Sequence, residues 1–187
     1  MHELTQPLRK EHIISDDIAS IRSAALPWEK LNETTVLISG ASGFLASYIV
    51  EVLASLNRSG FNIEILGLVR DMQKASVKLG HLQKHGLKLI LQDLSKPIQH
   101  DFRKVDFIIH AASQASPKYY GADPVGTIAA NTIGTNELLN LSVAKNTNTF
   151  LYFSSGEVYG EPVSSTSNLT ETDFGYLNPA SIRACYA

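Results

Sequence analysis

The sequence predicts an α/β protein with a doubly wound parallel sheet of about five strands. The apolar, β-branched run Val36–Ile38 is typical of a strand that is buried on both faces. Gly40 and Gly43 follow at once, and apolar residues then recur at helical spacing as far as Leu56. Strand-like and helix-like segments continue to alternate along the chain, which is the pattern of parallel strands joined by right-handed crossovers.

Size and composition indicate a globular protein that binds a small molecule. The 187 residues are 44% hydrophobic and 18% charged, which suffices for one buried core. The net charge of −2 gives no electrostatic reason to expect binding to nucleic acid or to an anionic membrane. The sequence starts without a signal region, lacks a membrane-spanning run and contains one cysteine, so we expect a cytoplasmic protein.

We divide the chain into an N-terminal extension, residues 1–33, and a nucleotide-binding domain, residues 34–187. The Ser-Asp-Asp run at 15–17 could cap a short helix that Pro27 ends. Trp28 could then anchor this arm against the first strand, and a mobile extension is the alternative.

The first strand leads into the motif Gly40-x-x-Gly43-x-x-Ala46. Gly40 would permit a tight turn, Gly43 would let a phosphate approach the backbone, and Ala46 would stand where close helix packing needs a small residue. Such a Rossmann-like turn points free N–H groups and the helix dipole at a dinucleotide pyrophosphate, although an ordinary turn is the alternative. The residues expected to contact the cofactor here are Gly40, Ser42, Gly43, Phe44 and Leu45.

The end of the second expected strand, Phe61–Val69, would lie at the adenosine ribose. An acidic residue there accepts hydrogen bonds from the ribose hydroxyls and favours NAD, whereas an arginine pairs with a 2′-phosphate and favours NADP. Asp71 favours NAD, whereas Arg70 favours NADP. We predict NAD as the cofactor, and Arg70 leaves NADP open. A solvated charge pair that caps the next helix is the plain alternative.

More cofactor contacts are expected after the third and fourth strands, 87–91 and 105–110. Asp93 could accept a hydrogen bond from the adenine amine while Leu94 packs on the ring, or Asp93 could cap a helix. Small residues after the fourth strand would let the backbone approach the cofactor, and these are Ala111, Ala112 and Ser113.

One histidine pair has a spacing that metal ligands use on a helix. His81 and His85 stand four positions apart, but no third ligand follows them. We therefore expect surface histidines and no metal.

Pro124 opens a long helical pattern that ends near Lys145, and a fifth strand, 149–153, follows. That strand delivers Ser155 and Glu157 to the carboxyl edge of the sheet, where open α/β folds bind their ligands. We expect the chemistry at this edge.

Taken in order, these motifs resemble the extended short-chain dehydrogenase/reductases, or NAD-dependent epimerase/dehydratase family, that act on nucleotide sugars. The runs Ala112–Pro117 with Tyr120 and Arg183-x-Cys185-Tyr186 look most like UDP-glucuronate decarboxylases. The resemblance covers about residues 35–187 and rests on Gly40-x-x-Gly43-Phe44-Leu45, Asp93-Leu94, His110-Ala111-Ala112, Ser154-Ser155-Gly156-Glu157-Val158-Tyr159-Gly160 and Tyr186.

The resemblance implies a role for each residue near the fifth strand. Ser155 would hydrogen-bond the reacting sugar oxygen, Tyr186 would be the general base, and Glu157 would be a second carboxylate near the sugar; a structural role for Glu157 is the alternative. The implied reaction oxidises a UDP-sugar at C4, releases its carboxylate as carbon dioxide and returns the hydride from the same NAD. Further contacts are implied for Ser116, Tyr120 and Arg183 with the substrate and for Asn131 and Ser154 with the cofactor.

Two departures from the family pattern limit these expectations. Related 4,6-dehydratases place an Asp-Glu pair where this chain has Gly156-Glu157, which argues against dehydration. The family's base is a Tyr-x-x-x-Lys pair, and the sequence ends one residue after Tyr186, before such a lysine. We therefore expect a fragment of a longer enzyme, with the C-terminal substrate region beyond Ala187.

Several functions stay open on these residues. A nucleotide-sugar 4-epimerase is the first alternative to the decarboxylase, and a 4,6-dehydratase is the second. An inactive NAD(P)-binding remnant is the alternative that is not an enzyme. The family resemblance also allows a homodimer formed through the long helix after the fourth strand and the helix that carries Tyr186, of which only the first is expected in full within these residues.

Overall fold

The computed structural model describes residues 6–162, 168–182, 184 and 186. A parallel five-stranded sheet in the order β3-β2-β1-β4-β5 forms its centre, which confirms the predicted doubly wound fold class. The strand order reverses between β1 and β4, and ligands of open α/β sheets bind beyond the carboxyl ends of the strands at such a point. The strands are β1 (Thr35–Ser39), β2 (Glu64–Val69), β3 (Leu87–Leu91), β4 (Phe107–His110) and β5 (Thr149–Tyr152).

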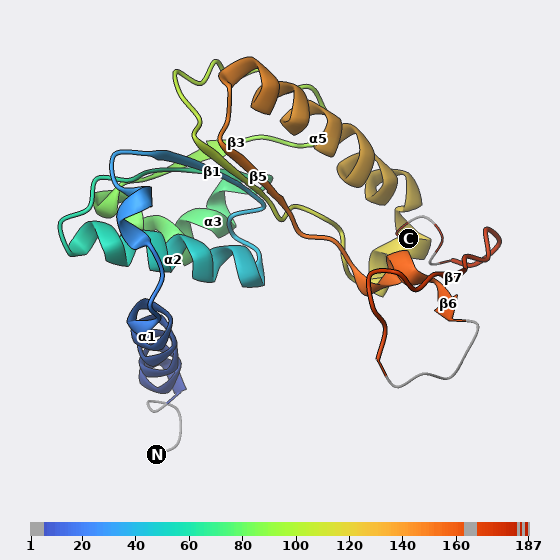
Figure 1. Cartoon of the computed structure of the whole chain (residues 1–187), viewed down its shortest axis with the longest axis horizontal. Coiled ribbons are helices and arrows are strands. Elements are labelled where there is room, and N and C mark those ends of the chain that lie inside the picture. Colours follow the sequence, from blue (N-terminus) through green and yellow to red (C-terminus); the bar gives the residue numbers. More distant parts are fainter. Residues whose placement is uncertain (1–5, 163–167, 183, 185, 187) are drawn as a thin grey trace.

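Helices cover both faces of the sheet (Figure 1). On one face lie α2 (Phe44–Arg58) and α3 (Met72–Leu79), the latter continued by a 3₁₀ segment, Gly80–His85. The opposite face carries α5 (Pro124–Lys145), whose bounds agree with the long helix expected from the sequence. The short helix α4 (Pro117–Ala122) precedes it.

The core forms two layers because successive residues of β1 point to opposite faces of the sheet. Val36 and Ile38 pack on the α2 side, whereas Leu37 packs with Ile108 and with Leu138 of α5. All residues of β1 are buried, as the apolar run predicts.

Two strands begin later than the sequence suggests. Residues 61–63 lie outside β2, because the backbone N–H and carbonyl of Ile63 are both bonded to the Asn57 side-chain amide at 2.8 Å. Similarly, the carbonyl of Val105 accepts a hydrogen bond from the Thr147 hydroxyl at 3.0 Å, two residues before β4 begins.

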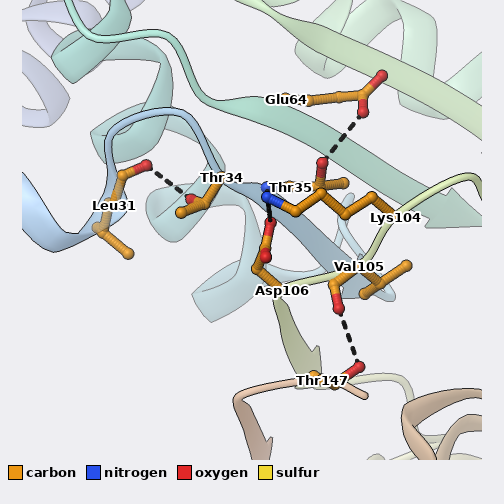
Figure 2. Close-up of polar contacts among 8 residues, drawn as sticks. All are labelled: Leu31, Thr34, Thr35, Glu64, Lys104, Val105, Asp106 and Thr147. Atoms are coloured by element: carbon orange, nitrogen blue, oxygen red, sulfur yellow. Dashed lines mark hydrogen bonds and ion pairs between the residues drawn. The ribbon is translucent and has the colours of Figure 1, made fainter. Parts of the chain in front are cut away.

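Polar contacts join the amino ends of the central strands (Figure 2). The backbone N–H of Thr35 donates to Asp106 Oδ2 at 2.8 Å, and its hydroxyl donates to Glu64 Oε2 at 3.2 Å. Lys104 Nζ lies 2.9 Å from the same Asp106 oxygen. These contacts fix this edge structurally, and the opposite, carboxyl edge holds the candidate site.

The N-terminal arm packs on the domain through α1 (Gln6–Ser23). The expectation that residues 15–17 begin this helix is wrong, because α1 starts at Gln6 and these residues lie within it. Their carboxylates are used elsewhere: Asp16 bonds His12 at 2.9 Å, and Asp17 accepts a hydrogen bond from the Tyr48 hydroxyl at 3.1 Å.

The expected anchor of the arm is confirmed. Ile18 of α1 is buried, and Arg22 Nη1 donates to the Ser55 carbonyl of α2 at 3.3 Å. Trp28 and Leu31 lie in a 3₁₀ turn, Trp28–Leu31, and pack against the core on the α2 side of the sheet.

A short antiparallel ribbon of β6 (Glu161–Pro162) and β7 (Gly175–Tyr176) follows the last strand of the main sheet along the chain. Among the helices of the described residues, none combines the length and apolarity needed to cross a membrane.

Candidate functional site

The turn between β1 and α2 depends on the backbone freedom of Gly40. Its φ of 66° lies in the left-handed region, and a Cβ added there would stand 2.8 Å from the Ala112 Cα. Gly40 therefore lets the loop after β4 pass directly over the turn.

Gly43 begins α2 without supplying a side-chain cap. Its own N–H donates to the Gly40 carbonyl at 2.7 Å, which closes the turn. The first N–H groups of α2 thus lack a capping side chain from the preceding residue, and the positive end of the helix dipole stays open to an anion. Ala46 is buried against the core, where the third position of the motif needs a small residue.

A cavity of about 290 Å³ lies at this turn. Residues after β1, β2, β3 and β4 line it, so it occupies the expected edge of the sheet. It brings together most of the cofactor residues predicted from the sequence, namely Gly40, Ser42, Gly43, Arg70, Asp71, Asp93, Leu94, Ala111, Ala112 and Ser113.

Four of the predicted cofactor residues do not line this cavity. Phe44 and Leu45 are 75% and 56% exposed at the start of α2. Asn131 is half-buried in α5, and its carbonyl accepts a hydrogen bond from the Thr135 hydroxyl at 2.6 Å. Ser154 is exposed just beyond β5.

Some lining residues were missed by sequence reasoning. Lys74 stands one helical turn after Asp71, a signal that the helical spacing of α3 could have provided. Gln92 precedes Asp93, and Ala130 precedes Asn131, so adjacency to predicted residues was a further signal. The missed lining residues are Leu68, Lys74, Gln92, Gln114 and Ala130.

Asp71 is the N-cap of α3. Its Oδ1 accepts a hydrogen bond from the Lys74 backbone N–H at 3.0 Å, and Oδ2 lies 3.4 Å from Lys74 Nζ. The backbone hydrogen bond is the main cause that lowers the pKa of the Asp71 carboxyl. The helix-capping interpretation of Asp71 is thus confirmed. Arg70, beside it, is exposed and, within the described part of the chain, has no hydrogen bond or ion pair.

Asp93 holds a turn after β3. Its Oδ1 accepts hydrogen bonds from the Ser95 backbone N–H at 3.0 Å and hydroxyl at 2.8 Å, and the former is the main cause that lowers the pKa of Asp93. The alternative of a helix cap is wrong, because no helix begins there. Leu94 is buried against α5, where a Cβ on Gly134 would stand 2.9 Å from the Leu94 Cβ.

Below the cavity lies a buried polar chain that the sequence did not reveal. His110 Nδ1 lies 2.8 Å from Ser39 Oγ, and His110 Nε2 lies 2.9 Å from Thr135 Oγ1. Ser39 Oγ also accepts hydrogen bonds from the N–H groups of Ala111 and Ala112 at 3.1 and 3.2 Å. Burial lowers the pKa of His110 to about 4, so the ring is neutral near pH 7.

Lys78 of α3 supports the glycine turn from outside. Its Nζ donates to the carbonyls of Ser42 and Gly43 at 3.0 and 3.2 Å. Partial burial lowers the pKa of Lys78. This residue was also missed, because a lysine two turns into a polar helix gives no local signal of its partners.

The residues predicted for chemistry lie after β5 and near α4. Ser155 precedes a 3₁₀ turn, Gly156–Tyr159, and its Oγ accepts a hydrogen bond from the Glu157 N–H at 3.2 Å. Both side chains are half-buried. Ser116 is the exposed N-cap residue of α4.

The Tyr186 ring stacks on the Tyr120 ring with centroids 5.0 Å apart and an interplanar angle of 18°. Tyr120 is buried, so it offers a fixed platform. Ile182 also reaches α4, since a Cβ on Gly121 would stand 2.7 Å from the Ile182 Cδ1. The predicted substrate residue Arg183 lies outside the described residues.

The histidine pair shows no metal geometry. His81 is exposed and lies 3.0 Å from Glu51 Oε1, which supports its interpretation as a surface histidine. Within residues 6–162, 168–182, 184 and 186, no three His, Cys, Asp or Glu side chains could jointly hold an ion.

Sequence comparisons relate this chain to enzymes of nucleotide sugars. A family model described as "NAD dependent epimerase/dehydratase family" matches residues 36–184. UDP-glucuronic acid decarboxylase 4 of Arabidopsis thaliana is 33% identical over 151 residues, which are 81% of this chain and 32% of that protein. UDP-glucuronic acid decarboxylase 1 of Danio rerio is 33% identical over 153 residues, which are 81% and 34% of the two chains. The chain thus spans about a third of the length of these relatives.

Solved structures share the fold. The UDP-Glc/GlcNAc 4-epimerase from Campylobacter jejuni is 25% identical with a TM-score of 0.59, over 78% of this chain and 44% of that one. The UDP-N-acetylglucosamine 4-epimerase from Methanobrevibacter ruminantium M1 is 22% identical with a TM-score of 0.67, over 83% and 47%.

Proposed function

Because the chain belongs to the NAD dependent epimerase/dehydratase family, we propose that it is the cofactor-binding part of an enzyme that modifies nucleotide sugars, of UDP-glucuronate decarboxylase type. One observation carries the proposal: the glycine turn, the uncapped start of α2 and the small residues after β4 meet around one cavity at the strand-order reversal. The 33% identity to two UDP-glucuronic acid decarboxylases supports the reaction type.

The residues around the cavity fit a dinucleotide. The first N–H groups of α2 would bind the pyrophosphate, and Ala111, Ala112 and Ser113 leave room beside it. Asp93 keeps Oδ2 available to accept a hydrogen bond from adenine, because both its contacts with Ser95 use Oδ1. When bound, the oxidised nicotinamide dinucleotide would accept a hydride from the sugar C4 and later return it.

The chain's own residues would orient the sugar and move its proton. Ser155 Oγ accepts a hydrogen bond from the Glu157 N–H, so its own proton is available for a substrate oxygen. Tyr186 would take the proton from the C4 hydroxyl, and its stack on the buried Tyr120 ring would fix the direction of the phenol. Ser116 and Arg183 would contact the UDP-sugar.

A 4-epimerase is the second candidate. It uses the same serine, tyrosine and cofactor, and the 25% identical structure from Campylobacter jejuni is that of a 4-epimerase. The two reactions differ in one product, because only decarboxylation releases carbon dioxide. Gly156 before Glu157 argues against a 4,6-dehydratase, as the sequence indicated.

Two organisational features belong to the same proposal. Residues 1–33 would form an extension on a cofactor domain of residues 34–187. The second feature is a homodimer through α5, which presents exposed apolar side chains at Val125, Ile128, Ile133, Leu139 and Val143.

The test is a calorimetric and thermal-shift titration of the chain with NAD and with NADP. Saturable binding of either should raise the melting temperature, because a ligand that binds the folded state stabilises it. UDP-glucuronate is then added to a chain extended beyond Ala187, and carbon dioxide and the sugar product are measured; release of carbon dioxide favours the decarboxylase, and C4 inversion alone favours the epimerase. A cooperatively folded chain that binds neither dinucleotide would be the inactive remnant instead.

A further inference from the structure

The end of β2 lies directly beside the glycine turn. β1 and β2 are paired in register, with Ser39 opposite Leu68, and the Ala41 N–H donates to the Leu68 carbonyl at 3.2 Å. Val69 ends the strand, and Arg70 is the next residue. A dinucleotide whose pyrophosphate lies on the turn would therefore place its adenosine ribose at Arg70 and Asp71.

The carboxylate of Asp71, the acidic residue at this position, already makes contacts within the protein. Both oxygens of Asp71 face Lys74, one at 3.0 Å from the backbone nitrogen and the other at 3.4 Å from the ammonium. A ribose 2′-hydroxyl needs an acceptor there to favour NAD, and it would have to compete with the cap of α3.

The arginine is available, in contrast. Its side chain lines the cavity and, within the described part of the chain, makes no hydrogen bond or ion pair. Asp93 and Asp123 lie within electrostatic reach of it, but their carboxylates accept hydrogen bonds from Ser95, Gln114 and Gly126 instead. A guanidinium presents a planar set of donors that matches a phosphate dianion.

A second cation lines the same end of the cavity. The Lys74 side chain is 85% exposed, and its contact with Asp71 is long for an ion pair. Its ammonium would add a point charge to the planar contact from Arg70.

From this placement we propose that the ribose end of the cavity selects a dinucleotide with a 2′-phosphate, so that the chain binds NADP in preference to NAD. Arg70 is the specificity-determining residue, and Lys74 assists it. The inference rests on the proposed cofactor function of the same cavity.

The experiment is a calorimetric titration of the full chain with NADP and, separately, with NAD. The wild-type chain should bind NADP more tightly by about tenfold to a hundredfold, the range expected of charge-assisted hydrogen bonds. Arg70→Gln should remove most of this preference and leave the NAD affinity within about twofold. Because Arg70 is exposed, the variant should keep the wild-type melting temperature.

The matched control is Arg58→Gln. It makes the same change of charge at the far end of α2, outside the cavity, and should alter neither affinity. Tighter binding of NAD than of NADP, or an equal loss of both in Arg70→Gln, would overturn the inference while leaving the dinucleotide site intact. Binding of neither by the folded chain would instead remove the proposed function and the inference with it.

Discussion

Ser39 and His110 join the two strands that flank the strand-order reversal, with Ser39 Oγ 2.8 Å from His110 Nδ1. Ser39 accepts hydrogen bonds from the N–H groups of Ala111 and Ala112, so its hydroxyl donates to the ring. His110 Nε2–H then donates to Thr135, whose hydroxyl donates to the Asn131 carbonyl. This chain of donors ties the floor of the cavity to α5.

Ser39→Ala should therefore destabilise the protein by about 1–3 kcal/mol, because it leaves the N–H groups of Ala111 and Ala112 and the Nδ1 of His110 without their hydrogen-bond partner. Dinucleotide affinity should fall as well, since the loop after β4 loses its attachment beside Gly40. Urea unfolding and calorimetry measure the two effects. Ser76→Ala, an exposed change in α3, serves as the control and should leave both values unchanged. Equal stability of the two variants would contradict the role of the network.

The depressed pKa of His110 predicts acid sensitivity. Burial lowers this pKa from 6.5 to about 4 in the folded protein, so below pH 6.5 the unfolded chain binds a proton that the folded chain does not. Stability should fall between pH 6.5 and pH 4 by up to about 3 kcal/mol from this group, and this loss should end below pH 4.

The measurement compares unfolding free energies of wild type and His110→Gln across that range. Carboxylates titrate in both proteins, so the difference between the two curves isolates the imidazole. His81→Gln removes an exposed histidine and controls for the substitution itself. Parallel curves for wild type and His110→Gln would contradict the prediction.

Ser42→Asp should lower dinucleotide affinity at least about tenfold with little change in melting temperature. It adds a negative charge beside the uncapped start of α2, where the pyrophosphate would lie. Gly40→Asp should also abolish binding, but its positive φ and the nearby Ala112 backbone make unfolding part of that result. Ser76→Asp is the charge-matched control, and an equal loss of affinity there would reject the placement of the phosphates.

Lys78→Met should weaken dinucleotide binding several-fold. It removes the hydrogen bonds that Lys78 donates to the carbonyls of Ser42 and Gly43, but a side chain of similar length still covers the turn. Lys84→Met, on the exposed side of the neighbouring 3₁₀ segment, provides the control. Titration with the tighter-binding dinucleotide checks both variants, and unchanged affinity in Lys78→Met would show that the turn holds its shape unaided.

The sheet and its helices could be read from the sequence because apolar periodicity and glycines are local signals. The long helix opened by Pro124 is an example, as is the buried run before Gly40. The start of α1 was misplaced because the carboxylates at 16 and 17 bond His12 and Tyr48 rather than the backbone. A helix boundary that depends on contacts made only in the folded protein leaves no pattern in the local sequence.

The same contrast applies to the candidate site. Residues that directly follow strands could be found, since parallel strands bring their carboxyl ends to one edge. The supports of the site could not, because His110 and Lys78 act through partners that the fold alone brings near: Ser39 lies 71 positions before His110, and Ser42 lies 36 positions before Lys78.

In a final prediction, two substitutions of Tyr186 separate the stacking of its ring on Tyr120 from the chemistry of its hydroxyl. Tyr186→Phe keeps the ring and should leave the melting temperature and dinucleotide affinity unchanged, whereas Tyr186→Ala should lose about 0.5–1.5 kcal/mol of stability. Both variants should lose proton transfer, because neither carries a phenol. Turnover of UDP-glucuronate with bound dinucleotide, measured in the longer enzyme of which this chain is expected to be a fragment, reports this loss, and unfolding curves measure the stack. Tyr176→Phe and Tyr176→Ala, at an exposed tyrosine of β7, are the matched controls. Turnover that survives in Tyr186→Phe would exclude Tyr186 as the base, since the stack alone would then account for its position.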